Sequence, residues 1–371
     1  MNLKEAVFSK DERAIYRLRS LYMSYGYRKY RMSKFEEYDF YVRNKGFLVS
    51  DNIITFTDSD GKLMALKPDV TLSIIKNSKY SGLGVEKVYY NENVYRAAED
   101  KQIKEIMQTG LECIGNIDDY CMCEVVLLAA KSLEYISPDY VLDISNMEII
   151  SEAMAFAGVG DGISADILRA FGEKNVQGVE HICKINNISK EGTDLLKSLV
   201  TLYGRPGEVL PKLKQISVSD TFRTAIGQME NITKVLEENG CGENVRIDFS
   251  VVNNMKYYSG IAFKGFINGI HGGVLSGGQY DKLMQKMGKR TGAIGFAVYL
   301  DMLGMLENDA ADFDTDVLLI YGEGETSADI SRAVKQLSEG GVSVMAQCRI
   351  PEKIRYRKLM KLEKGQVITV E

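Results

Sequence analysis

Hydrophobic positions along this chain follow two different periods, and the period changes from one region to the next. In the segment KDERAIYRLRSLYMSYGY, apolar residues recur at the spacing of one helix face, at Ile15, Leu18, Leu21 and Tyr22. Gly26 follows where a glycine commonly ends a helix. The pattern therefore predicts an amphipathic helix near the N-terminus.

The next part of the chain, up to residue 146, is typical of strands with a few helices between them. The segment IITFTDSDGKLMALKP indicates two strands joined by the turn Asp58-Ser59-Asp60-Gly61, and Pro68 is expected to end the second strand. The further predictions are a helix at 69–78, a strand that begins at 86 and leads into a charged loop, a return strand at 103–115, a helix at 123–136 and a strand at 139–146.

Helical spacing dominates from about residue 148 to 235, which predicts a helical insert between two strand-rich parts. Strand patterns return in VRIDFSVV, KYYSGIAFKGF and GVLSGGQY, and a helix is predicted to begin at 281. The segment 292–306, GAIGFAVYLDMLGML, is strongly apolar and opens with glycine, so it is interpreted as a helix. Together these elements predict an α+β core at 1–306.

Residues 307–315, ENDAADFDT, are acidic and unpatterned, and we interpret them as a linker. The remaining residues, 316–371, have the strand and helix signals of a small α/β module. Within it, KIRYRKLMKLEKG is basic with charges at helical spacing, which favours a solvated helix face over a binding patch.

Composition narrows the possible functions. The 371 residues carry a net charge of −5, which argues against nucleic acid as the main partner. Neither an apolar N-terminal signal nor a membrane-length apolar run is present, so a cytoplasmic protein is expected. Two histidines and six scattered cysteines offer no metal site. Cys121 and Cys123, taken as same-face residues of a strand, have nothing nearby to complete a tetrahedron. No cofactor is predicted.

Three stretches of sequence occur in an order that identifies a family. They are LKPDVT (66–71), NVYRAAEDKQIKEIMQTGLECIG (93–115) and NMKYYSGIAF…GGQYDKLM…GAIGFAVYLDML (254–303). The chain resembles histidyl-tRNA synthetase, a class II synthetase, and its paralogue, the regulatory subunit of ATP phosphoribosyltransferase in histidine biosynthesis. The resemblance covers most of 10–305. It implies a six-stranded antiparallel sheet flanked by helices, a dimer, and a C-terminal module that is a shortened anticodon-binding domain.

The resemblance also implies a pocket for histidine. The candidate histidine-binding residues are Asp69, Thr71, Arg96, Gln108, Glu112, Tyr257 and Tyr258. A zwitterion with an imidazole ring needs carboxylates for its ammonium, acceptors for its ring N–H and an aromatic wall. Each residue also has a simpler interpretation. Asp69 can cap a helix, Gln108 and Glu112 can form the polar face of a strand, and the two tyrosines can be core and surface neighbours.

The same resemblance implies that the catalyst has been lost. A synthetase places three arginines around the ATP phosphates, and only Arg96 matches one of them. Asn253 and Met302 stand at the other two positions, and strand alternation would place Lys256 on the face opposite Asn253. The loop after Arg96 is shorter than in the synthetase, and Met32-Ser33 replace the proline of the first class II motif.

These features predict a non-catalytic regulatory subunit, which would activate a short-form catalytic subunit and mediate feedback inhibition by histidine. The stretch LVTLYGRPGEVLPKLK (199–214) resembles a segment typical of that subunit. The expected assembly is a homodimer within a hetero-oligomer, with L-histidine as a possible ligand and neither tRNA nor membrane as partner. Gln279 and Met302 depart from the regulatory family, which commonly has arginine there. Two alternatives stay open, a divergent synthetase and another paralogue, such as an amino-acid sensor or a protein-modifying ligase.

Overall fold

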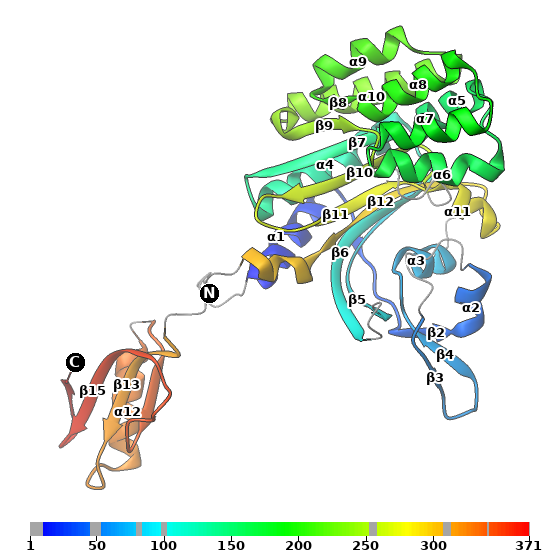
Figure 1. Ribbon diagram of the computed structural model, residues 1–371. Coiled ribbons are helices and arrows are strands. Elements are labelled where there is room, and N and C mark those ends of the chain that lie inside the picture. Colours follow the sequence, from blue (N-terminus) through cyan, green and yellow to red (C-terminus); the bar gives the residue numbers. More distant parts are fainter. Residues whose placement is uncertain are drawn as a thin grey trace. The chain divides into compact units, whose positions relative to one another are not determined.

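The computed structural model describes residues 10–44, 53–78, 84–97, 102–251, 258–306, 313–339 and 341–370. The chain divides into two compact units, Met1–Leu306 and Glu307–Glu371 (Figure 1). Residues 307–312, within the predicted linker, lie outside the described ranges, and the first strand of the second unit already begins at Thr315.

A nine-stranded sheet forms the centre of the first unit, in the order β1-β5-β6-β12-β11-β10-β7-β9-β8. The strands are β1 (Arg28–Lys29), β5 (Val85–Ala97), β6 (Ile103–Gly115), β7 (Tyr140–Asn146), β8 (Tyr203–Gly204), β9 (Val245–Asp248), β10 (Ile261–Ile267), β11 (Leu275–Gln279) and β12 (Gly292–Tyr299). The six strands from β5 to β7 in this order are all antiparallel. β1 pairs in parallel with β5, and β9 pairs in parallel with β7 but antiparallel with β8. The predicted α+β fold with an antiparallel sheet is confirmed.

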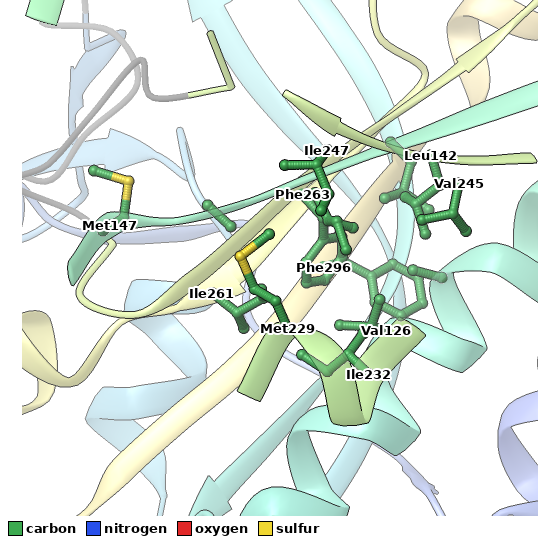
Figure 2. Packing of buried hydrophobic residues seen from close by; sticks show 14 of the residues in the cluster. Val126, Leu142, Met147, Met229, Ile232, Val245, Ile247, Ile261, Phe263 and Phe296 are labelled. Atoms are coloured by element: carbon green, nitrogen blue, oxygen red, sulfur yellow. The ribbon is translucent and has the colours of Figure 1, made fainter. Parts of the chain in front are cut away.

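One face of this sheet is apolar and is covered by helices. It packs against α1 (Lys10–Ser24), α4 (Asp119–Ile136) and α10 (Asp220–Glu238). Figure 2 shows Phe263 of β10 and Phe296 of β12 against Val126 of α4 and Ile232 of α10. Burying such a side chain contributes about 1.5–3 kcal/mol, so this face supplies much of the stability of the unit. The opposite face is free of these helices and faces the functional site.

The segment with helical spacing folds as α5 (Met147–Phe156), α6 (Asp161–Gly172), α7 (Val176–Ile185), α8 (Lys190–Thr201), α9 (Pro206–Gln215) and α10, drawn in green in Figure 1. Side-chain caps begin several of these helices. For example, Ser219 accepts a hydrogen bond from the Phe222 N–H at 3.1 Å. The short strand β8 interrupts the helices and pairs with β9, so this region also contributes an edge strand to the sheet.

A smaller sheet lies beside the C-terminal part of β5. Its strands are β2 (Phe35–Glu37), β4 (Leu63–Leu66) and β3 (Thr55–Thr57), and it is accompanied by α2 (Tyr38–Arg43) and α3 (Thr71–Asn77). The predicted turn is confirmed. Asp58 Oδ1 accepts from the N–H groups of Asp60 and Lys62 at 2.9 and 2.8 Å, and Gly61 takes a positive φ of 81°.

The second unit is a four-stranded sheet with one helix. It contains β13 (Thr315–Tyr321), α12 (Ser327–Ser338), β14 (Val344–Gln347), β15 (Tyr356–Glu363) and β16 (Gln366–Thr369), in the strand order β14-β13-β15-β16. The basic helix predicted at 353–365 is wrong, because this segment forms β15. Lys364 and Gly365 both have positive φ and connect the paired residues Glu363 and Gln366, which makes a two-residue hairpin.

Two further predictions of local structure are wrong. The apolar segment 292–306 forms β12 and then a 3₁₀ helix, η4 (Leu300–Leu306), rather than one α-helix. β12 lies between β6 and β11 and is largely buried, so its sequence shows no alternation. Cys121 and Cys123 lie in α4, not in a strand, because Asp118 caps that helix by accepting from the Cys121 N–H.

Candidate functional site

The sheet face opposite the covering helices is polar, and strand register brings its residues into rows. One row runs Tyr90, Gly110, Ala297, Ser276, Lys264 and Asp143 across six strands. The three central members of this row are small. The sheet surface between Tyr90 and Lys264 is therefore low, which leaves room above it.

A pocket of about 450 Å³ occupies this space, a volume suited to a small ligand. Six of the seven predicted site residues line it: Asp69, Thr71, Arg96, Gln108, Glu112 and Tyr258. The seventh, Tyr257, lies outside the described residues, as do Asn253 and Lys256. Residues that are 150 to 190 positions apart along the chain thus meet in one cavity.

The start of α3 supplies Asp69 and Thr71. Asp69 Oδ1 accepts from the Leu72 N–H at 2.8 Å, so Asp69 stabilises the first turn of α3 and also lines the pocket. The helix-cap interpretation is confirmed, and the histidine-binding role of Asp69 stays a prediction. Burial raises the pKa of Asp69, and the nearby Arg96 charge and two backbone N–H groups oppose that rise.

The segment that leads into α3 is held against β5. Lys67, fully buried, forms an ion pair of 2.7 Å with Glu92, and the Tyr95 N–H donates to the Lys67 carbonyl at 2.9 Å. Arg96 Nε donates to the Pro68 carbonyl at 3.2 Å. These contacts fix Asp69 and Thr71 over the edge of the sheet, and they also bring Arg96 beside Asp69.

Glu112 is the more enclosed of the two carboxylates that line the pocket, with 2% of its surface exposed. Thr71 Oγ1 donates to Glu112 Oε1 at 2.7 Å, and the Tyr280 hydroxyl donates to Oε2. The carboxyl lies directly over Gly295, where a Cβ would overlap Oε2. Burial raises the pKa of Glu112 to about 8, and the Asp69 charge adds to this, while the Tyr280 and Thr71 hydrogen bonds oppose it.

Aromatic side chains close the other sides. Tyr258 lies against Gly278, where a Cβ would be 2.6 Å from its ring, and burial raises the pKa of the Tyr258 hydroxyl. The Ser276 and Tyr299 hydroxyls form a hydrogen bond of 2.8 Å. Sequence reasoning did not identify the lining residues Tyr90, Lys264, Ser276, Tyr280 and Tyr299. Most of them lie at strand positions that share a face with Gln108 and Glu112. That shared face is the sequence signal by which they could have been found.

The residues at positions where a synthetase contacts phosphate do not all line the pocket. Arg96 lines the pocket, but Met302 is absent from the lining residues and packs, half-buried, against the apolar core. The described cations that line the pocket are Arg96 and Lys264.

The described residues contain neither a cluster suited to a metal ion nor a helix suited to a membrane. No group of histidine, cysteine or acidic side chains in the ranges that the structure covers is arranged to hold a metal ion. None of the described helices combines the length and apolar character needed to cross a bilayer.

Comparisons with known proteins agree on one family. A family model described as histidyl-tRNA synthetase matches residues 2–303. The ATP phosphoribosyltransferase regulatory subunit of Caldanaerobacter subterraneus subsp. tengcongensis is 31% identical over 341 residues, covering 89% of this chain and 88% of that protein.

Solved structures show the same fold. An ATP phosphoribosyltransferase regulatory subunit/histidyl-tRNA synthetase from Bacillus halodurans superposes with a TM-score of 0.81 at 23% identity, over 95% of this chain and 93% of the other. An ATP phosphoribosyl transferase (HisG:HisZ) complex from Thermotoga maritima contains a chain with a TM-score of 0.63 at 17% identity, over 78% of this chain and 97% of that one. This chain belongs to the ATP phosphoribosyltransferase regulatory subunit family, whose members share the class II histidyl-tRNA synthetase fold.

Proposed function

We propose that this chain binds L-histidine in the pocket above the sheet, activates a separate short-form ATP phosphoribosyltransferase and conveys feedback inhibition by histidine to it. The observation that carries the proposal is a contrast between the pocket and Met302. Asp69 and Glu112 are buried in the pocket and accept hydrogen bonds from the Leu72 N–H and from Thr71, whereas Met302, at the sequence position where a synthetase has an arginine, packs against the core.

The chemistry of the pocket suits histidine. Asp69 and Glu112 offer carboxylates to an ammonium group, and Gln108 adds a buried amide. Tyr258, Tyr280 and Tyr299 supply aromatic walls and hydroxyls for an imidazole ring. A buried carboxyl with a raised pKa favours a cationic ligand, because the ligand's charge stabilises the ionised form.

The proposal also requires that the chain does not activate histidine. Transfer of a carboxylate to the α-phosphate of ATP accumulates negative charge that fixed cations must stabilise. Losing one such preorganised group typically lowers the rate by about 10²–10³. The methionine at 302 packs into the core instead of facing the pocket, and Asn253 replaces a second arginine in the sequence. We therefore expect no histidine-dependent exchange of pyrophosphate into ATP.

The partner is inferred from relatives. The Thermotoga maritima structure is named as a HisG:HisZ complex of ATP phosphoribosyl transferase. By analogy this chain would form homodimers within a hetero-oligomer in the cytoplasm, without tRNA. A coupling free energy of about 1–3 kcal/mol between the two sites would suffice for regulation, which corresponds to about a 5- to 150-fold change in affinity.

The first test is isothermal titration calorimetry of the purified chain with L-histidine. We expect binding that Asp69→Asn and Glu112→Gln both weaken, while thermal unfolding shows that both variants remain folded. If the wild-type chain gives no heat either alone or with the catalytic subunit, histidine sensing in this pocket is ruled out.

The second test measures phosphoribosyl transfer by the catalytic subunit. Adding this chain should raise the rate, and L-histidine should lower it again, less so with the Glu112→Gln chain. A catalytic subunit that is equally fast with and without this chain would contradict the regulatory role. Pyrophosphate exchange that depends on histidine would instead support a divergent synthetase.

A further inference from the structure

Lys264 is a pocket residue that no family motif identified. It lies near the middle of β10, half-buried, in the same row as Ser276 and Ala297. It is one of the two described cations that line the pocket. Arg96 comes from β5, several strands away in the sheet order.

The loop that precedes β11 leaves space for the Lys264 side chain. A Cβ at Gly273 would overlap Lys264 Cε and would be 3.0 Å from Cγ, so the absence of a side chain there leaves room for the lysine stem. The ammonium lies 5.4 Å from the centroid of the Phe266 ring. The stem is thus packed between glycine backbone and an aromatic ring, which restricts where the charge can lie.

The charge itself has no close partner within the part of the chain that the structure describes. Asp143 is directly opposite Lys264 in register on β7, but the two do not form an ion pair. Asp143 is 7% exposed, and its Oδ1 accepts no hydrogen bond. The other nearby carboxylate, Asp248, is already paired with Lys174 at 2.6 Å. Burial and the Asp248 charge raise the pKa of Asp143 to about 7, and the Lys174, Arg246 and Lys264 charges oppose that rise. Lys264 is thus adjacent to Asp143 and also lines the pocket.

The acidic groups of the pocket lie at the far end. Glu112 is on β6 and Lys264 is on β10, with β12 and β11 between them. At about 4.8 Å per strand, their backbones are separated by about 14 Å. Both side chains line the same cavity, together with the small residues Gly295, Ala297 and Ser276. The pocket therefore has an acidic end and a cationic side, an arrangement that matches a zwitterion.

We propose that Lys264 holds the carboxylate of the amino acid bound in this pocket, and that Asp143 is a positioning residue that keeps the Lys264 ammonium charged and directed along the sheet face. The inference rests on the proposed function, because it concerns the same cavity. It adds a basis for specificity. Asp69 and Glu112 alone would accept any imidazole-bearing amine, whereas Lys264 would favour the ligand that has a carboxylate.

The experiment compares L-histidine with L-histidinol, which keeps the ammonium and the imidazole but lacks the carboxylate. Calorimetry is performed on the wild type, Lys264→Gln and Lys264→Arg. A matched control is Lys289→Gln, which removes another half-buried lysine, one bound to the Ser78 carbonyl at 3.0 Å and outside this pocket. Losing a charged hydrogen bond should weaken L-histidine binding by about 10- to 100-fold in Lys264→Gln, with partial recovery in Lys264→Arg.

The quantity that tests the inference is the ratio of the L-histidine affinity to the L-histidinol affinity. In the wild type L-histidine should bind more tightly than L-histidinol, and this preference should collapse in Lys264→Gln but persist in Lys289→Gln. If histidinol binding is too weak to measure, the loss of L-histidine affinity and its recovery in Lys264→Arg decide the question. Unchanged L-histidine affinity in a folded Lys264→Gln chain overturns the inference while leaving the proposed function intact. No L-histidine binding by the wild type overturns both.

Two variants test the supporting residues. Gly273→Ala should displace the lysine stem and lower the preference for L-histidine over L-histidinol without removing any charge. Asp143→Asn should lower the same preference by less than Lys264→Gln. A merely structural role for Asp143 would weaken both ligands equally, so a constant ratio in Asp143→Asn would remove it from the proposal.

Discussion

The two ends of the pocket differ in how their polar groups are held. At the acidic end, Asp69, Thr71 and Glu112 are buried and joined to the backbone or to one another by hydrogen bonds. At the other end, Lys264 is half-buried without an ion-pair partner in the described chain. The polar groups at the acidic end are thus fixed by their neighbours, whereas Lys264 is held mainly by the packing of its stem.

The largest expected effect comes from adding one methyl group at the acidic end. Gly295→Ala would place a Cβ against Glu112 Oε2 and the Leu111 carbonyl. Overpacking of this kind costs about 1–3 kcal/mol of folding free energy, and we expect L-histidine binding to fall by more than about 100-fold because Glu112 is displaced. Chemical denaturation and calorimetry measure the two effects.

The control for this variant is Gly227→Ala in α10, where an added Cβ meets nothing within 4 Å. It should leave binding unchanged and stabilise the protein by up to about 1 kcal/mol, since alanine is the better helix former. Normal histidine affinity in Gly295→Ala would show that Glu112 is not needed where the structure has it.

A smaller effect should separate the two roles of Asp69. Asparagine can still cap α3, so Asp69→Asn should lower L-histidine affinity by about 10- to 100-fold with little loss of stability. Asp69→Ala should lose the cap as well, at about 1 kcal/mol. Asp118→Ala, which removes the cap of α4, should cost similar stability without affecting affinity. Equal binding by wild type and Asp69→Asn would reduce Asp69 to a helix cap.

The raised pKa of Glu112 predicts how many protons are released when L-histidine binds. Because that pKa is about 8, the carboxyl is mostly protonated at pH 7, and an arriving ammonium should ionise it. The Glu112 carboxyl should then contribute the release of about one proton at pH 7 and almost none above about pH 9.5, beside any protons that the ligand itself takes up. Calorimetry in buffers of different ionisation enthalpy measures the number, and Glu112→Gln, which has no proton to release, supplies the baseline to subtract. Identical proton release by both proteins would contradict the assignment.

The same group makes stability depend on pH. Burial raises the pKa of Glu112 above its unfolded value, so its contribution to the free energy of unfolding is full below about pH 4.5 and is lost as pH rises through about 8. Denaturation curves between these values should show stability falling with pH in the wild type, and falling less in Glu112→Gln. Parallel curves for the two proteins would mean that Glu112 is ionised in the folded state.

The smallest effect is expected at Met302, which packs against the apolar core outside the pocket. Met302→Arg restores the residue type of a synthetase but removes a half-buried apolar side chain, so we expect a loss of about 1 kcal/mol in stability. L-histidine affinity should stay within about twofold, and pyrophosphate exchange should remain undetectable, since a single cation does not replace the others. Exchange activity gained by this one substitution would show that the catalytic end is nearly intact.

Local sequence patterns predicted much of the fold. The return strand at 103–115 was found with the same limits, because alternating polar residues and a terminal glycine mark both of its ends. The same approach failed for β12 and β15. β12 is buried between two strands and shows no period, while the charges of β15 happen to follow helical spacing although Leu359 and Leu362 are buried on it.

Motifs in the chain were enough to identify the family and to name Asp69, Gln108 and Glu112 as candidate pocket residues. What those side chains face follows from the packing of strands that are distant in the sequence. The register of six strands places Gly295 beneath Glu112, aligns Lys264 with Ser276 and Asp143, and buries Glu112 enough to raise its pKa. The physical reason is that charge, burial and reach depend on neighbours from distant strands, which no local pattern in the chain records.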